Sequence, residues 1–257
     1  MKKYLLCMLM ALPFVFTSCS DSDDNDDNDE NGIKLEKSEY KMNFQDKVQI
    51  EATSPSDIVY QSENEYVATV STSGLITGGR VGETEIALSN GNGTKKVKVI
   101  IEPKSELYPE PEFPFGETRD NIIKKHGKPD AEDDESIVYK NYSSNTEAIM
   151  YMFDGKEGKS KLTGISVLLK SSYSNTKELA AHLAERYIMT SGEGDLTLIG
   201  MNSSKVENAT VLVGVQLFGS YWGVMYVPYS KGAKSSLMSD SFQLTSVMRS
   251  NLLKYTK

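Results

Sequence analysis

Two histidines are the residues of this 257-residue chain best suited to acid–base or metal chemistry. His126 falls one residue before a predicted helix end, where a protonated imidazole suits the negative end of the helix dipole. His182 lies beside the apolar stripe of a second predicted helix, so we expect it to face solvent or to be half-buried. A zinc site needs about three protein ligands, and the sequence has neither an HExxH motif nor a Cys/His cluster. We therefore predict that both histidines are structural and that the chain holds no metal and no cofactor.

The other groups that could do catalysis are one acidic turn and one serine. Asp133, Asp134 and Glu135 could act as paired carboxylates, but a polar turn before a predicted strand is a more typical place for surface charge. Ser220 directly follows a glycine in Gly219-Ser220-Tyr221-Trp222-Gly223, so the segment differs from the G-x-S-x-G nucleophile elbow. We predict that the chain has no catalytic residues and is not an enzyme.

The segment Phe218–Tyr229 is the densest aromatic run and contains the only tryptophan. On a strand, Trp222 and Tyr226 would share one face, and Tyr221 and Tyr229 would lie on the other. Exposed aromatic side chains stack on sugar rings or anchor protein interfaces, so these four residues are the candidate site for a glycan or protein ligand. The alternative is that they are core residues, which is the common role of aromatic side chains. We expect the Trp222 face to be core and the Tyr221/Tyr229 face to be accessible.

Cys19 is the remaining residue whose surroundings indicate chemistry. Residues 1–18 have a basic start, an apolar run too short to span a bilayer, and a small-residue exit, which is the order of a secretory signal peptide. The ending Phe-Thr-Ser-Cys resembles the lipobox of bacterial lipoproteins. The resemblance implies cleavage after Ser18, a diacylglyceryl group on the Cys19 thiol and an acylated amine, and two or more acyl chains anchor a protein stably. The alternative is an ordinary secreted protein in which Cys19 is incidental.

The mature chain would keep a single cysteine. Cys7, the other of the two cysteines, lies in the signal peptide, so no intramolecular disulfide is possible. Residues 19–32 carry only acidic charge after the cysteine and predict an unfolded tether. Acidic residues directly after a lipidated cysteine also resemble the surface-export signal of Bacteroidetes lipoproteins, which implies the outer surface of the cell. The rest of the chain is nearly balanced in charge, so we expect no nucleic-acid partner.

Residues 33–103 show the two-residue alternation of β-strands. Apolar and polar residues alternate in 48–52, 84–88 and 97–101, and glycine-containing turns separate the runs, which predicts a two-sheet sandwich. A composite motif strengthens this prediction; its segments are Tyr60-x-Ser62-x-Asn64, Val67-Ala68-Thr69-Val70, Gly74-Leu75-Ile76-x-Gly78 and Gly82-x-Thr84-x-Ile86. This motif resembles the bacterial Ig-like domain, group 2, of invasin- and intimin-type surface proteins, although the family usually has Trp where Tyr60 stands. The resemblance implies a stalk that spaces and displays, without catalytic residues to transfer.

The proline-rich residues 104–114 predict a stiff, extended linker with few contacts across the boundary, so we expect residues 33–103 and 113–257 to fold separately. From residue 115 onward the pattern reads α-βββ-α-βββ-α. The predicted elements are a helix from Thr118 to Gly127, strands over 137–142, 148–153 and 161–170, a helix from Asn175 through Ile188 towards Gly192, strands over 196–202, 209–217 and 221–228, and a last helix with an apolar stripe from Leu244 to Tyr255. This order predicts an α+β fold for residues 115–257, with an antiparallel sheet and helices on one side.

A second resemblance concerns the start of this α+β domain. Phe115-Gly116-x-Thr118-x-x-x-Ile122, followed by Gly127-x-Pro129, is similar to the helix opening of small outer-membrane assembly lipoproteins and of β-lactamase-inhibitor-like folds. We use this similarity for the fold alone.

Together these patterns predict a non-catalytic, surface-anchored lipoprotein. It would be attached to the outer membrane through the lipid on Cys19, with an Ig-like stalk that displays an α+β head for adhesion or binding of a glycan or protein ligand. The alternative is a periplasm-facing outer-membrane lipoprotein that acts in envelope assembly or as an enzyme inhibitor. An enzymatic head ranks third.

Overall fold

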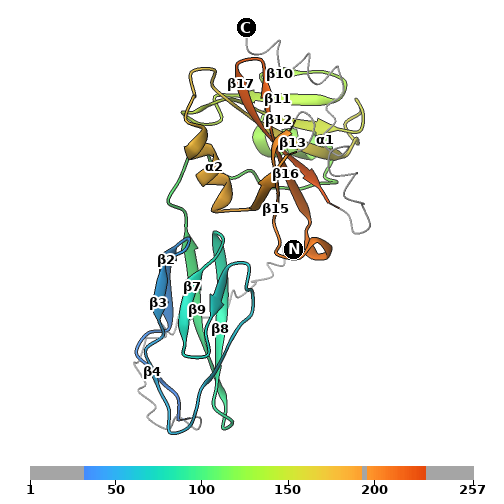
Figure 1. The fold of residues 1–257 in the computed structure, drawn as a ribbon. Helices are drawn as coiled ribbons and strands as arrows, with labels where there is room; N and C mark the ends of the chain where they lie inside the picture. The colour runs from blue at the N-terminus through green and yellow to red at the C-terminus, as the bar shows by residue number, and fades with distance from the viewer. Residues whose placement is uncertain (1–31, 193–195, 230–257) are drawn as a thin grey trace, which may run out of the picture.

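The computed structural model describes residues 32–192 and 196–229 (Figure 1). Two groups of β-strands follow one another, and we call them the N-terminal unit (residues 32–103) and the C-terminal unit (residues 104–229). The predicted signal peptide, Cys19, nearly all of the acidic tether and the apolar stripe from Leu244 to Tyr255 lie outside the described residues.

The N-terminal unit is a sandwich of two sheets. Strands β2, β9, β8 and β5 form one sheet in that order, β3, β7 and β6 form the second, and β1 pairs with β4. Their bounds are β1 (Lys34–Leu35), β2 (Glu39–Asn43), β3 (Lys47–Gln49), β4 (Ala52–Thr53), β5 (Val59–Ser62), β6 (Ala68–Val70), β7 (Leu75–Gly78), β8 (Gly82–Ser89) and β9 (Thr94–Glu102). The predicted two-sheet sandwich is confirmed.

The alternation in the sequence decides which side chains fill this sandwich. Ile86 and Leu88 of β8 and Val97, Val99 and Ile101 of β9 are buried, while the residues between them are at least partly exposed. Because successive side chains on a strand point to opposite faces, one apolar row per strand is enough to build a shared core. The members of this core are Ile33, Tyr40, Met42, Ile50, Val67, Ala68, Ile76, Ile86, Leu88, Val97, Val99 and Ile101.

The first long strand of the unit and its last strand lie side by side in parallel. β2 pairs with β9 from Glu39 opposite Lys98 to Asn43 opposite Glu102. Every other strand pair between described elements is antiparallel. After the two-residue strand β1, which pairs with β4, the next strand of the unit and its last strand are therefore paired with each other.

Gly74 explains part of the composite motif. It turns the chain before β7 with a φ of +81°, a left-handed conformation that glycine adopts at no steric cost. A Cβ on Gly74 would lie 2.8 Å from the ring of Tyr60. The tyrosine ring therefore packs directly on the glycine, and any side chain at position 74 would displace it.

The C-terminal unit is built on one antiparallel sheet with strand order β10-β11-β12-β13-β17-β16-β15-β14. Its elements are α1 (Arg119–His126), β10 (Ala131–Glu132), β11 (Ser136–Lys140), β12 (Thr146–Phe153), β13 (Leu162–Leu169), α2 (Thr176–Ala184), β14 (Ile188–Ser191), β15 (Leu196–Met201), the short 3-10 helix η1 (Val206–Asn208), β16 (Val211–Phe218) and β17 (Tyr221–Pro228). The predicted strands are present, and β10 and β14 extend the sheet at its two edges.

The ends of α1 agree with the prediction, whereas the end of α2 does not. Thr118 caps α1 by accepting from the backbone N–H of Asn121, and Asn175 caps α2 by accepting from that of Glu178. α2 ends at Ala184, so the prediction that it continues through Ile188 is wrong. Ile188 instead pairs with Met201 in the edge strand β14, because strand pairing satisfies the backbone groups of this segment better than another helical turn.

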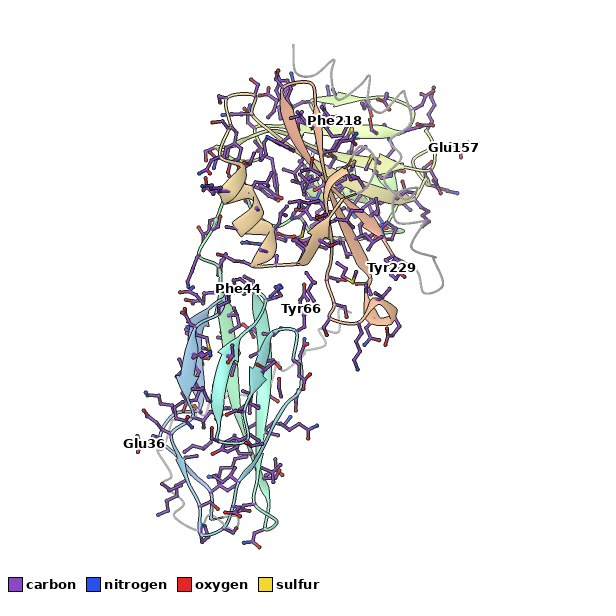
Figure 2. The ribbon with its side chains drawn as sticks, in the orientation of Figure 1. Glu36, Phe44, Tyr66, Glu157, Phe218 and Tyr229 are labelled. Carbon is purple, nitrogen blue, oxygen red and sulfur yellow. The ribbon has the colours of Figure 1, made fainter. Side chains whose placement is uncertain are left out.

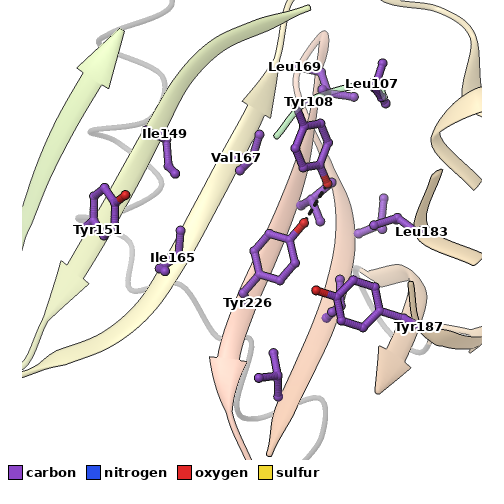
Figure 3. Packing of buried hydrophobic residues seen from close by; sticks show 14 of the residues in the cluster. Leu107, Tyr108, Ile149, Tyr151, Ile165, Val167, Leu169, Leu183, Tyr187 and Tyr226 are labelled. Atoms are coloured by element: carbon purple, nitrogen blue, oxygen red, sulfur yellow. Dashed lines mark hydrogen bonds between the residues drawn. The ribbon is translucent and has the colours of Figure 1, made fainter. Parts of the chain in front are cut away.

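Two apolar layers lie on the two faces of the sheet. We call the layer that includes residues of α1 and α2 the helix-side core (Figure 3). Its members are Leu107, Tyr108, Ile122, Ile137, Ile149, Tyr151, Phe153, Leu162, Ile165, Val167, Leu169, Leu179, Leu183, Tyr187, Val211, Val213, Val215, Val224 and Tyr226. We call the layer on the other face the opposite-face cluster; its members are Val138, Ala148, Met150, Met152, Leu168, Leu196, Ile199, Leu212, Phe218, Met225 and Val227.

The segment 104–114 differs from the predicted spacer. Leu107 and Tyr108 are each 2% exposed and belong to the helix-side core. The Asn145 side chain donates to the backbone oxygen of Leu107 at 3.0 Å, and the ring of Phe113 lies 5.0 Å from that of Tyr226. The segment bends at residues 104, 107 and 108, and burial of its leucine and aromatic side chains holds it against the sheet. It is therefore part of the C-terminal unit.

Candidate functional site

The aromatic run that was the candidate binding site lies on β17 and just after it, and the structure places it largely inside the protein. Tyr226 is 0% exposed, and its hydroxyl lies 2.8 Å from that of Tyr108 (Figure 3). Burial raises the pKa of Tyr226 well above its ordinary value, so the hydroxyl stays protonated and hydrogen-bonded. Tyr226 is consequently a core residue, as expected for its face of the strand, and of the four candidate residues it is the one that a ligand cannot reach.

The other three aromatic residues are half-buried. Trp222 packs against the helix-side core, as expected for its face of the strand. Tyr221 and Tyr229 pack against the opposite-face cluster instead of forming the accessible face that we expected. The reason is that both faces of this sheet are apolar, so the side chains of both rows are at least partly covered.

The two histidines lie on different helices and have different environments. His126 is exposed at the end of α1, with its ring 5.3 Å from that of Tyr151. His182 on α2 is 0% exposed, so the expectation of a solvent-facing or half-buried residue is wrong. Its Nδ1 lies 3.1 Å from the backbone oxygen of Ser105, and burial lowers its pKa to about 4. His182 is therefore a neutral imidazole that holds the segment 104–114 against α2.

The turn after α2 joins the two units (Figure 2). The carboxylate of Glu185 accepts from the backbone N–H groups of Lys104 at 2.9 Å and Ser105 at 3.0 Å. Its backbone oxygen accepts from Val81, which precedes β8 in the N-terminal unit, at 2.8 Å. The Arg80 guanidinium donates to the backbone oxygen of Tyr187 at 3.1 Å. We call this contact region the joint, and it contradicts the expectation of few contacts across the boundary.

Arg186 and Tyr66 complete the joint. Arg186 donates to the backbone oxygens of His182 at 2.9 Å and Ser105 at 3.2 Å, and its Nε lies 3.2 Å from a carboxylate oxygen of Glu110. The Tyr66 hydroxyl, from the N-terminal unit, donates to the backbone oxygen of Arg186. Each of these groups is used to hold backbone in place, so the joint has the chemistry of a structural connection.

A polar cleft of about 540 Å³ lies beside the joint and has one wall from each unit. The N-terminal wall is residues 62–66, between β5 and β6, and the C-terminal wall comes from the loop 202–208 after β15. Asn202 anchors that loop, because its side-chain oxygen accepts from the backbone N–H groups of Thr210 and Val211, each at 3.0 Å. The full lining is Ser62, Glu63, Asn64, Glu65, Tyr66, Asn202, Ser203, Ser204, Lys205 and Asn208.

Several side chains of the cleft have polar groups that are available to hydrogen-bond a ligand. Glu65, Ser204 and Asn208 are exposed, and their side chains make no hydrogen bond within the part of the chain that the structure describes. Glu63 is paired with Lys96 at 2.6 Å. The cleft therefore offers carboxylate, hydroxyl and amide groups from two loops that the joint holds at a fixed spacing. Such an arrangement can bind a polar ligand by hydrogen bonds.

Residues 37–101 match the family described as bacterial Ig-like domain (group 2). This segment is a bacterial Ig-like domain. A search of curated proteins found no match. One solved structure that the chain resembles is "Crystal Structure of Human Protocadherin-24 EC1-2 Form II", at 9% identity over 71% of this chain and 84% of that chain, with a TM-score of 0.18, which is too low to support an argument.

The match covers the Ig-like domain from just before β2 to almost the end of β9, and the C-terminal unit lies outside it. Within residues 32–192 and 196–229, neither helix has the length and hydropathy of a membrane span. In the same residues no group of three or more His, Cys, Asp or Glu side chains is placed to hold a metal ion.

Sequence reasoning did not find the cleft. Asn64 belongs to the composite motif of the Ig-like domain, and the loop 202–208 has the polar composition of any surface turn. The two walls are far apart in the sequence, and only the joint brings them together. The sequence offered only the charged residues Glu185 and Arg186 directly after an amphipathic helix, and the burial of Glu185, which marks this turn as a contact, is visible only in the structure.

Proposed function

We propose that this chain is a non-catalytic lipoprotein of the bacterial cell surface, in which the Ig-like domain and an α+β C-terminal domain bind a glycan or protein ligand. The lipobox-like sequence before Cys19 and the acidic residues after it support the anchor and its outward orientation. The Ig-like domain supports a role in display. The ligand site is the polar cleft beside the joint, in place of the aromatic strand.

The observation that carries the binding proposal is the shared lining of the cleft. Ligand sites in proteins lie preferentially at interfaces between domains, because loops from two rigid bodies can converge there. Here the Val81 N–H donates to the backbone oxygen of Glu185 and Arg80 donates to that of Tyr187, which fixes the two walls, so little conformational entropy is lost when a ligand binds. The Ig-like domain then acts as half of the site as well as a stalk.

The anchor and the orientation are tested together. We expect the wild-type protein to be labelled by a lipid precursor and by a membrane-impermeant biotin reagent on intact cells, because no other anchor is predicted. Cys19→Ala should abolish lipid labelling and release soluble protein. Lipid-labelled protein that resists biotin in intact cells and reacts after lysis would refute the surface location and favour the periplasm-facing alternative.

The cleft is tested with the soluble mature chain carrying Cys19→Ala, probed on an array of glycans and proteins. Asn208→Ala should weaken binding of the strongest ligand by about fivefold without changing Tm, since one lost hydrogen bond contributes about 1 kcal/mol. The matched control is Asn92→Ala, an exposed asparagine in the turn between β8 and β9, outside the cleft lining. Equal affinity of both variants and the parent would refute the assignment of the site to this cleft.

A further inference from the structure

We propose that residues 230–257 of this same chain cover the opposite-face cluster as an amphipathic helix. Every member of that cluster is 8% exposed or less, and Met150, Leu168 and Met225 are at most 1% exposed. Neighbouring side chains on a sheet shield each other at their flanks, but their tips are buried only when a second layer packs on the face. This face must therefore carry a second layer.

The described residues do not supply that layer. Ile122 of α1 and Leu179 and Leu183 of α2 all belong to the helix-side core. The members of the opposite-face cluster and their partly buried neighbours lie on strands of the sheet or directly after β17. β10 and β14 are the two edges of the sheet and do not pair with each other, so the sheet does not close on itself.

Three segments of the chain lie outside the described residues, and only one suits this face. Residues 1–31 consist of the predicted signal peptide and the acidic tether, and they precede the Ig-like domain. Residues 193–195 are a short connection between β14 and β15. Residues 230–257 directly follow β17, and the side chains of Val227 and Tyr229 at its end already lie on the opposite-face cluster.

The sequence of the third segment matches the chemistry of the face. Leu244, Val247, Met248, Leu252 and Tyr255 have the spacing of one helical stripe. From Leu244 to Tyr255 a helix would extend about 17 Å. The distance across the four strands β12, β13, β17 and β16 is about 14 Å at the usual strand spacing. The methionines at 150, 152 and 225 on the face and at 248 in the segment are adaptable apolar side chains that fill irregular gaps.

The test uses the soluble mature chain with Cys19→Ala and two single variants. Met248→Glu places a charge in the apolar stripe, whereas Ser246→Glu places the same charge on the opposite side of the helix. We expect Met248→Glu to lower Tm by about 5–10 °C and to raise the fluorescence of the dye ANS several-fold, while Ser246→Glu leaves both unchanged. Truncation after residue 229 should give the same rise in ANS fluorescence, and a synthetic peptide of residues 230–257 should reverse it.

Three results would overturn the proposal. Equal Tm and ANS fluorescence for Met248→Glu and Ser246→Glu would show that the apolar stripe does not pack on the opposite-face cluster. A truncated chain that neither binds ANS nor responds to the peptide would show that this face has another cover. A full chain that is dimeric by light scattering, and that binds ANS only on dilution to monomer, would assign the face to a second copy.

Discussion

Replacement of Glu185 by alanine should release residues 104 and 105, which closely follow β9, from the turn after α2, and should thereby weaken the joint with the Ig-like domain. The Glu185 residue is 5% exposed, and its carboxylate accepts two backbone hydrogen bonds at 2.9 and 3.0 Å from Lys104 and Ser105. Hydrogen bonds to a charged group contribute about 1.5–3 kcal/mol each. The donors lie in a partly exposed segment that water can reach after the change, so we take the lower value for each and expect a loss of about 3 kcal/mol.

Calorimetry on the soluble mature chain measures this effect. For a chain of this size, about 3 kcal/mol corresponds to a fall in Tm of roughly 6–12 °C. We expect the wild type to unfold in one transition and Glu185→Ala to separate it into two, because the Ig-like domain has its own core. The control is Glu106→Ala in the same segment, since Glu106 is exposed and makes no interaction within the described residues. If the two variants melt within 1–2 °C of each other (roughly 0.5 kcal/mol), the carboxylate does not hold the joint.

Three further predictions concern the C-terminal unit. A fragment of residues 104–257 should fold, whereas 113–257 should not by circular dichroism, because loss of a buried aromatic side chain alone costs about 3–5 kcal/mol. The free energy of unfolding should fall by roughly 3 kcal/mol as the pH drops from about 6.5 to about 4, because His182 becomes protonated in the unfolded chain but not in the folded chain. Urea titrations at several pH values measure this fall, and His182→Gln should make it smaller. Tyr226→Phe should lower the free energy of unfolding by about 1 kcal/mol and leave ligand affinity unchanged. A loss of affinity without a loss of stability would show instead that Tyr226 contacts the ligand.

Much of the fold follows from local patterns in the sequence. The alternation in β8 and β9, together with the turn glycine Gly74, was sufficient to predict the sandwich, because each strand has one row of apolar side chains and that row is buried. The caps Thr118 and Asn175 gave the starts of both helices, since capping depends on a few neighbouring residues. The strands of the C-terminal sheet could be predicted because each is a short apolar run in the local sequence.

What failed depends on contacts between distant residues. Both faces of the C-terminal sheet are apolar, so alternation placed Tyr226 in the core correctly but could not show that Tyr221 and Tyr229 also pack against an apolar layer. The prolines of 104–114 led to the prediction of an exposed linker, whereas Leu107 and Tyr108 are buried against strands that come later in the sequence. The cleft exists only because the turn after α2 meets the Ig-like domain, and no local pattern encodes that meeting.

The parallel pairing of β2 with β9 has a mechanical consequence in the arrangement that we propose, in which a lipid holds one end of the protein and a ligand loads the other. Tension from the N-terminal side would first load β1, whose pairing with β4 is two residues long, then reach the β2–β9 pair at Glu39 and leave it at Glu102. In a parallel pair these points lie at opposite ends, so the load shears the strands along their length. The hydrogen bonds between them must then break together, whereas an antiparallel pair pulled from one end unzips bond by bond. A stalk connected in this way resists being pulled open by the object that it holds.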